Sequence, residues 1–433
     1  MGQGWTRALG VLAAAGALAL GGCGQGGSAA KPNTTYQEIL LQQLIDAKPG
    51  DVITIPAGVY AIDRGLSLDV DGVTIKGAGM DRTVLTFKGQ AAGAEGLLVN
   101  ASNFTIEDLA IEDAKGDALK VNEGENIIIR RVRAEWTGGP KTSNGAYGLY
   151  PVQVRNLLIE GCVAIGASDA GIYVGQSNNV VVRQNRAEFN VAGIEIENTQ
   201  NADVYDNLAT NNTGGILVFN MPNLKVPGFA TRVFRNRVKG NNTANFGRKG
   251  SAVASVPAGS GVVINSNDQV EIFDNDIGGN NTANVIVSSY FSTGYMSEKG
   301  VATAFDPWPE AIFIHDNRFS PGGNKPDGLD LQALRVALFG VTGRLPDVLW
   351  DGYVDVKKFK GGKVDPALAI CVDNGAAQTL NADSPNKSKA PRLVTDAVRC
   401  RLTPLPEIRV AAAGPVSASI PLTPDTVTFP AKP

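Results

Sequence analysis

The stretch from Gly148 to Asn220 carries a repeat that decides the fold. It contains four short blocks: Leu149-Tyr150-Pro151-Val152, Gly171-Ile172-Tyr173-Val174, Gly193-Ile194-Glu195-Ile196 and Gly215-Ile216-Leu217-Val218. The residues that end these blocks, Val152, Val174, Ile196 and Val218, are 22 positions apart. Short β-branched runs at such a period, with Asn and Gly between them, are typical of a parallel β-helix. The sequence therefore predicts an all-β chain, a solenoid of about 22-residue turns.

The composition favours one long repeat body over several unrelated domains. The 433 residues include 51 Gly, and only 6% are aromatic and 19% are charged. The net charge is −3, and the chain has no run of basic residues. Such a chain has no positive field with which to attract nucleic acid, so nucleic acid is excluded as an expected partner.

Residues 1–22 are predicted to be a lipoprotein signal peptide. Arg7 precedes the apolar run Val11–Leu20, which is too short to span a bilayer. Leu20-Gly21-Gly22-Cys23 resembles the lipobox of bacterial lipoproteins, in which Cys23 would be lipidated; an ordinary signal peptide with a chance cysteine is the alternative. Residues 23–34 would be a flexible tether. In resembling lipoproteins, a residue other than Asp after the lipidated cysteine indicates an anchor in the outer membrane. Gly24 therefore predicts that the protein is lipid-anchored in the cell envelope, at the periplasmic face of the outer membrane.

The remaining chain divides into a cap, a repeat body and an extension. Apolar residues at helical spacing over Tyr36–Ala47 predict a helix that caps the open apolar end of the first turn. We expect the β-helix to occupy residues 35–320 and an irregular extension with a Pro-rich tail to occupy residues 321–433. In that extension, Cys371 and Cys400 could form a disulfide in an oxidising periplasm. Cys162, at an inward position of the repeat, would be a small buried side chain.

Two parts of the sequence resemble known β-helix proteins. Ala47-Lys48-Pro49-Gly50-Asp51, followed by Ile55-Pro56-Ala57-Gly58-Val59-Tyr60, is similar to the opening of pectin-lyase-like right-handed β-helix proteins. Asp169–Ser177 and Ala192–Asn198 resemble a narrower group, bacterial envelope lipoproteins with a parallel β-helix and no assigned reaction. The resemblance covers roughly Tyr36 to Pro321 and implies right-handed turns, which is also the general preference of parallel crossovers. It implies no particular activity, because this fold hosts lyases, hydrolases, epimerases and non-catalytic proteins.

Side chains alternate across a strand, so the register also gives the residues that point outward. One outward column is Leu98, Lys120, Pro151, Tyr173, Glu195, Leu217 and Val263; the other is Asn100, Asn122, Gln153, Gly175, Glu197, Phe219 and Asn265. We predict that the polar part of these columns is the floor of a carbohydrate-binding groove, formed by Lys120, Asn122, Gln153, Tyr173, Glu195 and Glu197. Insertions at 136–145, 221–230 and 246–259 would form its walls. In resembling polysaccharide-active β-helix enzymes the substrate lies in such a groove.

Several of these residues are candidates for catalysis. Glu195 and Glu197 project from one strand about 6.7 Å apart at the backbone, which is compatible with either glycosidase separation of the carboxyl groups once the side chains rotate; two solvated carboxylates on a strand face are the alternative. Tyr173 or Lys120 could act as a base on a uronate. Asp169, in the turn before Gly171, could join Glu195 in binding calcium or sugar hydroxyls; a turn-forming Asp is the alternative.

Other features are predicted to be structural. Asn185, Asn207, Asn236, Asn275 and Asn317 occupy one position of successive turns, where amides about 4.8 Å apart can form a hydrogen-bonded ladder. The single histidine, His315, continues an outward stack with Tyr205, Phe234 and Phe273. With one His and no close cysteine pair, no zinc or copper site is expected. Calcium remains the one cofactor considered.

Two functions remain open, and the sequence does not decide whether the chain is an enzyme. The first is a carbohydrate-active envelope protein of lyase, epimerase or hydrolase type. The second is a non-catalytic binding or scaffold protein that presents a rigid face to a glycan or to another envelope protein. Related uronan epimerases use an Asp-Pro-His-Asp motif, whereas this chain has Asp306-Pro307-Trp308-Pro309, so their mechanism is not implied.

Overall fold

The computed structural model describes residue 33, residues 35–293 and residues 305–411. The expected signal peptide, Cys23 and nearly all of the expected tether lie outside these residues, as does the end of the chain from residue 412. Within the described part of the chain, no helix has both the length and the apolar character needed to cross a membrane.

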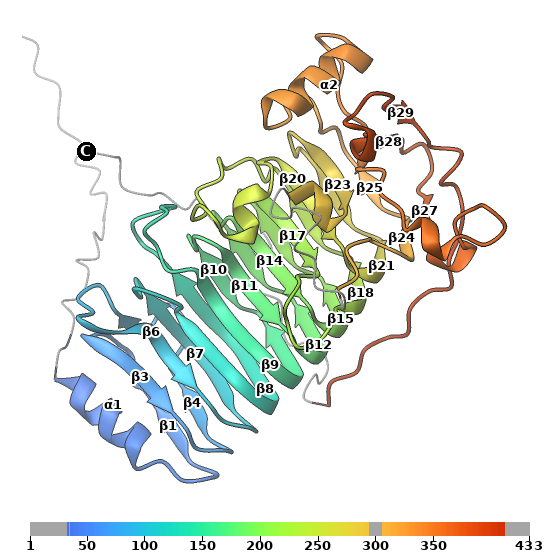
Figure 1. Cartoon of the computed structure of the whole chain (residues 1–433). Coiled ribbons are helices and arrows are strands. Elements are labelled where there is room, and N and C mark those ends of the chain that lie inside the picture. Colours follow the sequence, from blue (N-terminus) through green and yellow to red (C-terminus); the bar gives the residue numbers. More distant parts are fainter. Residues whose placement is uncertain (1–32, 34, 294–304, 412–433) are drawn as a thin grey trace, which may run out of the picture. The chain divides into compact units, whose positions relative to one another are not determined.

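Short strands stack in three parallel ladders, and each strand pairs with its equivalent one turn later (Figure 1). The first ladder comprises β3 (Arg64–Leu68), β6 (Ala92–Val99), the starts of β8 (Leu119–Glu135) and β9 (Tyr147–Glu160), β11 (Ala170–Gly175), β14 (Ala192–Glu197), β17 (Gly214–Phe219), β20 (Ser260–Asn265), β23 (Ala283–Ser288), β26 (Val348–Trp350) and β28 (Thr379–Asn381).

The second ladder comprises β1 (Val52–Thr54), β4 (Thr74–Lys76), β7 (Thr105–Glu112), later parts of β8 and β9, β12 (Asn178–Arg183), β15 (Gln200–Tyr205), β18 (Phe229–Phe234), β21 (Asp268–Phe273), β24 (Ile312–His315) and β27 (Ile370–Asp373). The third comprises β2 (Gly58–Ala61), β5 (Thr83–Thr86), the ends of β7 and β8, β10 (Val163–Ile165), β13 (Arg186–Glu188), β16 (Leu208–Thr210), β19 (Arg237–Lys239), β22 (Asp276–Gly278) and β25 (Arg318–Phe319). Three parallel ladders that enclose one core make a parallel β-helix.

The core is the space between the ladders. Val174 pairs in register with Ile196, and Ile196 pairs with Val218, and all three are fully buried in one apolar cluster. Their stacking confirms the predicted inward column. Because each turn adds its apolar residues to those of its neighbours, the core continues from turn to turn.

The predicted register was wrong by one residue for the turn that contains Val152. Val152 pairs with Gly175, and Pro151, which pairs with Val121, takes the inward position. The reason is a corner of unequal length. Five positions separate Ile165 from Ala170, but four separate their partners Glu188 and Ala192, so a count of 22 back from Val174 arrives one residue late.

Buried asparagines bond the turns to one another at two corners. Asn207 accepts hydrogen bonds from the backbone N–H and the side-chain amide of Asn185, at 2.9 and 3.0 Å, and donates to Asn236 at 3.0 Å. The ladder continues through Asn275 to Asn317, as predicted. The second ladder of asparagines, which the sequence reading missed, runs through Asn190, Asn212, Asn241 and Asn280.

Helix α1 (Tyr36–Ile45) caps the first turn. Leu40 and Leu44 are buried in the main core, which explains why the apolar positions of this helix repeat at helical spacing. Gln37 fixes the helix to the turn below, because its side-chain amide donates to Asp63 at 3.0 Å and accepts from the Asp63 backbone N–H at 2.7 Å. The expected cap is therefore present.

The parallel ladders continue beyond residue 320, where the sequence repeat fades. Strands β26, β27 and β28 pair in parallel with earlier turns, and β29 (Arg392–Leu393) closes the first ladder by an antiparallel pairing. These strands have at most four residues, and long insertions separate them, so no period remains in the sequence. The insertions hold α2 (Leu329–Phe339) and the short 3-10 helices η3 (Val356–Lys358), η4 (Pro366–Leu368) and η5 (Ser384–Asn386); η1 (Ala252–Ser255) and η2 (Tyr290–Thr293) lie earlier.

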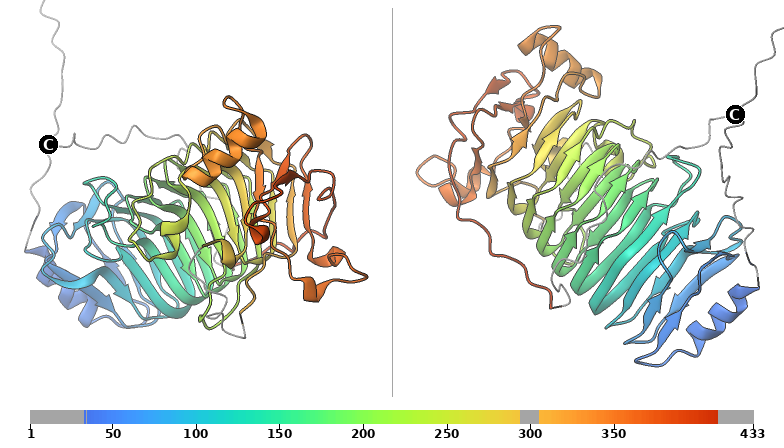
Figure 2. Two further views of the ribbon diagram at one scale, coloured as in Figure 1. Left: turned by 45° about the horizontal axis from the view of Figure 1, so that its top comes forward. Right: turned by 180° about the vertical axis from the view of Figure 1, so that it is seen from behind.

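The last described residues run back across the second ladder (Figure 2). The backbone N–H of Leu405 donates to Glu271 at 2.8 Å, and that of Ile408 donates to Asp203 at 3.2 Å. Val410 then packs on the outward side chain of Val181. This segment therefore covers the second ladder and leaves the outer face of the first ladder to other parts of the chain.

Candidate functional site

The outer face of the first ladder carries the polar residues selected from the sequence, with one change in each column. Lys120 of β8 pairs with Tyr150 of β9, and Tyr173 of β11 pairs with Glu195 of β14. The rings of Tyr150 and Tyr173 are 4.9 Å apart between centroids. Tyr150, rather than Pro151, is thus the outward residue between Lys120 and Tyr173.

The second outward column contains Asn122, Val152, Gly175 and Glu197. The predicted position of Gln153 in this column was wrong, for the same reason of register. Gln153 lies at the corner that follows, in the left-handed region with φ 58°, and its side-chain oxygen accepts a hydrogen bond from the Lys225 ammonium group. Asn122 remains on the face and donates to Asn100 of the previous turn at 3.2 Å.

Gly175 allows Tyr173 to reach Glu197. A Cβ atom at Gly175 would lie 2.4 Å from Cε1 of Tyr173, so the tyrosine ring occupies the space over this glycine. The Tyr173 hydroxyl donates a hydrogen bond of 2.7 Å to Oε1 of Glu197, the register neighbour of Gly175. A side chain at position 175 would displace the ring and break this bond.

Three of the nine tyrosines gather at this point. Tyr147 stands 4.5 Å from Tyr150 and 4.6 Å from Tyr173, measured between ring centroids. The Lys120 ammonium lies 5.1 Å from the centroid of Tyr150, within the range of a cation–π contact. Tyr173 is buried, whereas Tyr147 and Tyr150 are half-buried. The sequence reading missed Tyr147 and Tyr150, although the three tyrosines lie within 27 positions of one another.

Insertions stand on both sides of this face. On one side, Arg248 of the 246–259 insertion donates to the backbone carbonyl of Asn144 at 3.2 Å, which joins it to the loop before β9. On the other side, the backbone N–H of Lys225 donates to the Gln176 side chain at 3.1 Å. The expected flanking positions of these insertions therefore agree with their contacts.

Four carboxyl groups near the tyrosines hold their protons more strongly than usual. Burial raises the pKa of Asp117 to about 6. Burial, and then repulsion by Glu197 and Asp117, raises the pKa of Asp169 to about 7. Burial, with repulsion by Asp169 and Glu197, raises the pKa of Glu195 well above its usual range. For Glu197, burial raises the pKa and the Tyr173 hydrogen bond opposes that rise.

Glu195 is not a solvated residue of a strand face, so that alternative was wrong for it. It is 1% exposed, and Oε2 has no hydrogen-bond partner among the residues that the structure describes. A buried ionised carboxyl without a partner is very unfavourable, so the neutral acid is the stable form. Alternation correctly places the side chain outside the core, but Val253 and Val256 of the 246–259 insertion pack with Leu217 over the next turn and help to exclude water.

The arrangement can bind an anionic group and exchange a proton near neutral pH. Lys120 and the exposed Arg248 supply positive charge, and both lower the pKa of neighbouring Asp117. Asp169 titrates near neutrality, which is the condition for efficient general acid–base action. The phenol of Tyr150, whose pKa is raised to about 12 by burial, stays protonated and can donate a hydrogen bond.

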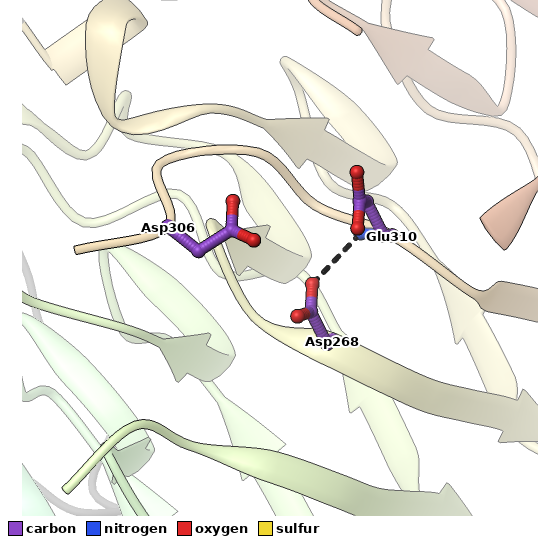
Figure 3. Close-up of side chains that lie close together, drawn as sticks. All are labelled: Asp268, Asp306 and Glu310. Carbon is purple, nitrogen blue, oxygen red and sulfur yellow. Dashed lines mark hydrogen bonds between the residues drawn. The ribbon is translucent and has the colours of Figure 1, made fainter. Parts of the chain in front are cut away.

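A second acidic cluster lies on another part of the chain. Asp268 of β21, Asp306 and Glu310 each offer a carboxyl oxygen, and these atoms lie within 4.8 Å of one another (Figure 3). The Lys358 ammonium forms ion pairs with two of its members, at 2.6 Å from both Asp306 and Glu310. Among the described residues this is the one group of three possible metal ligands that lie this close together. Asp169 and Glu195, the residues considered for calcium, are not part of it.

The cysteines and the histidine lie away from the tyrosine cluster. Cys371 and Cys400 are joined in a disulfide, and Cys162 is free and buried. The ring of His315 stacks on Phe273 at 5.3 Å between centroids and bonds Glu271 at 3.0 Å. The predicted aromatic stack on a separate face is confirmed.

Comparison with known proteins identifies the fold. Residues 71–228 match a family model described as a right handed beta helix region. The fold is a right-handed parallel β-helix. No curated protein sequence matches the chain.

Solved structures of this β-helix type include polysaccharide-active proteins. The A-module of mannuronan C-5 epimerase AlgE4 from Azotobacter vinelandii is 18% identical with a TM-score of 0.50, over 80% of this chain and 92% of that module. The AlgE6 A-module from the same organism is 17% identical with a TM-score of 0.47, over 75% and 87%. An alginate lyase, AlyF-OU02, solved with G6, is 13% identical with a TM-score of 0.39, over 74% and 76%. At these identities the likeness concerns the fold.

Proposed function

We propose that this chain binds an anionic polysaccharide across the outer face at Lys120 and Tyr150, and exchanges the proton on the sugar carbon beside the carboxylate. One observation carries the proposal. A cation, three clustered tyrosines and carboxyl groups that titrate near or above neutrality meet on one half-buried face between two insertions. Tyrosine rings offer an apolar face and a hydroxyl, which suit a sugar ring.

Each residue has a defined role in this proposal. Lys120 binds the sugar carboxylate and offsets the charge that develops when the neighbouring carbon loses its proton. The ionised form of Asp169 accepts that proton, the electron pair moves into the carboxyl group of the sugar, and the proton returns to the carbon. Glu195 stays neutral and so does not repel an anionic substrate. The mannuronan C-5 epimerase module supports a uronan as the substrate class by analogy of fold alone.

Proton exchange can be measured directly. Polymannuronate and polygalacturonate are incubated with the protein in D2O, with and without calcium, and deuterium at the sugar carbon is followed by NMR. We expect incorporation with one of these polymers, a loss of at least tenfold in Asp169→Asn, and weaker binding in Lys120→Met. Lys141→Met, which removes an exposed cation from the loop before β9, is the matched control and should change neither.

Binding without exchange would favour the second function, a non-catalytic glycan-binding or scaffold protein. This second function is favoured by the position of the single histidine. His315 lies on the second ladder and so has no role at this face. Absence of both binding and exchange with either polymer, or equal loss in Lys120→Met and Lys141→Met, would contradict the proposed site.

We also propose that Cys23 is lipidated and holds the protein at the periplasmic face of the outer membrane. Support comes from the sequence, namely the short apolar run Val11–Leu20 followed by Leu20-Gly21-Gly22-Cys23. Metabolic labelling with an alkyne fatty acid should mark the wild type and not Cys23→Ser, and fractionation should recover the labelled protein with outer membranes. Labelling of Cys23→Ser, or recovery of the wild type in the soluble periplasm, would contradict the anchor.

A further inference from the structure

A large cavity lies farther along the first ladder, between the strands and α2. Its volume is about 1030 Å³, at the upper end of the range for small-molecule sites. Phe219 of β17, the register neighbour of Glu197, lines its near end. Val256 of the 246–259 insertion also lines this end and belongs to the same apolar cluster as Leu217.

The strand wall of the cavity is mixed in character. Val263 of β20, Ile286 of β23 and Leu349 of β26 form an outward apolar column. Beside it, Asn265 and Ser288 form a polar column, in which the Asn265 amide donates to the Ser288 hydroxyl at 3.0 Å. These polar groups are held by their bonds to one another, so the wall is preformed.

The opposite wall is the aliphatic side of α2. Leu331, Leu334, Ala337 and Leu338 line the cavity, yet the helix has no fully buried residue, although it is rich in leucine. The segments on both sides of the helix are joined to the body: Asp327 accepts a hydrogen bond from the Ala258 backbone N–H at 2.9 Å, and Asp347 accepts one from the Asn284 side-chain amide of β23 at 3.1 Å. Leu331 and Leu334 pack against the apolar cluster over the first ladder, whereas Ala337 and Leu338 stay exposed over the cavity and leave room there for an apolar ligand.

The rim of the cavity is polar and electrically balanced. Asp330 and Lys387 contribute one charge of each sign, and Ser255, Ser384 and Ser388 contribute hydroxyls. Asp351 also lines the cavity but is used internally, since it accepts from Ser289 and Ser292 at 2.6 to 2.9 Å. A balanced rim with several hydroxyls favours an uncharged, hydroxyl-rich head group over an anionic or cationic one.

We propose that this cavity binds an amphiphile with one aliphatic chain and an uncharged sugar-like head. The chain would lie between α2 and the apolar column of β20, β23 and β26, and the head would meet the polar rim. Burial of the aliphatic chain provides most of the affinity, and the head provides selectivity. This site is independent of the polysaccharide function proposed above, and the two sites need not be occupied together.

Alkyl glycosides test the assignment. Binding of n-octyl β-D-glucoside below its micelle-forming concentration is measured by titration calorimetry, with D-glucose, octanoate and octylamine as comparison probes. We expect saturable binding of the glucoside and at least tenfold weaker binding of the other three. Ala337→Trp, which places a large ring in the cavity, should weaken glucoside binding at least tenfold. Val336→Trp, at the adjacent position outside the cavity lining, should leave it within twofold.

Two further measurements keep the outcomes distinct. Lys120→Met should bind the glucoside as the wild type does, whatever its effect on polysaccharides, and the thermal midpoints of both Trp variants show that they fold. The assignment is overturned if the glucoside does not bind saturably, if Ala337→Trp and Val336→Trp weaken it equally, or if octanoate or octylamine binds as tightly as the glucoside.

Discussion

Removing the hydroxyl of Tyr173 tests how the carboxyl cluster is tuned. This hydroxyl donates a 2.7 Å hydrogen bond to Glu197 and so opposes the rise in the Glu197 pKa that burial causes. In Tyr173→Phe the ring can remain over Gly175, because only the oxygen atom is removed. The substitution therefore changes only the pKa of Glu197 and the pKa values of the groups that the Glu197 charge influences.

The expected size follows from the value of one hydrogen bond. A hydrogen bond to a charged group contributes roughly 1.5 to 3 kcal/mol, and one pKa unit corresponds to about 1.4 kcal/mol. We expect the pKa of Glu197 to rise by roughly one to two units. The pKa of Asp169 should fall, because repulsion by ionised Glu197 is one of the causes that raise it. Proton exchange would then reach its maximum at a lower pH than in the wild type.

The assay is a carbon-13 NMR titration of the side-chain carboxyl groups, combined with the pH profile of deuterium incorporation. Tyr150→Phe is the matched control, since its hydroxyl bonds no carboxyl group among the described residues and its loss should leave the Glu197 pKa unchanged. If Tyr173→Phe shifts neither the Glu197 nor the Asp169 pKa, the tuning inferred from this hydrogen bond is refuted.

Three other predictions concern stability. Asn207→Ala removes four buried hydrogen bonds and should lower the free energy of unfolding by about 4 kcal/mol in urea titrations, whereas Asn100→Ala, which removes hydrogen bonds of an exposed side chain, should cost under about 1 kcal/mol; equal costs would contradict the ladder's role. The pKa of Asp169 is higher in the folded chain than in the unfolded chain, so the unfolded chain loses this proton at a lower pH. The free energy of unfolding that Asp169 contributes therefore falls as the pH rises from about 4 to about 7. Asp169→Asn should make the dependence of the unfolding free energy on pH flatter in this range, and an unchanged dependence would disprove this prediction. Cys371→Ser opens a loop with a sequence separation of 29 and should destabilise the C-terminal turns by roughly 3 to 4 kcal/mol; hydrogen exchange that stays equally slow there would count against this.

Much of the fold was predictable from sequence because its signals are local. A repeat of 22 residues and the alternation of side chains along a strand place Val174, Ile196 and Val218 in the core, and both follow from the geometry of one turn and its neighbour. The asparagine ladder through Asn207 and the cap by α1 follow in the same way, because each turn repeats the environment of the last.

The candidate site was only partly predictable, because its register and its burial depend on parts of the chain that the repeat does not describe. One extra residue at the corner before β11 places Tyr150 in the column of Lys120 and Tyr173, and it moves Gln153 out of the neighbouring column of Asn122 and Gly175. A count along the sequence cannot show at which corner an extra residue is absorbed.

Burial was decided only by the tertiary structure. The sequence places Glu195 outside the core, but the tyrosines and the 246–259 insertion close over this face and raise the pKa of its carboxyl group. The cavity under α2 likewise needs strands and a helix that are distant in sequence to come together. Alternation determines the direction of a side chain from its own strand, whereas the water around it is determined by whatever segments pack above it.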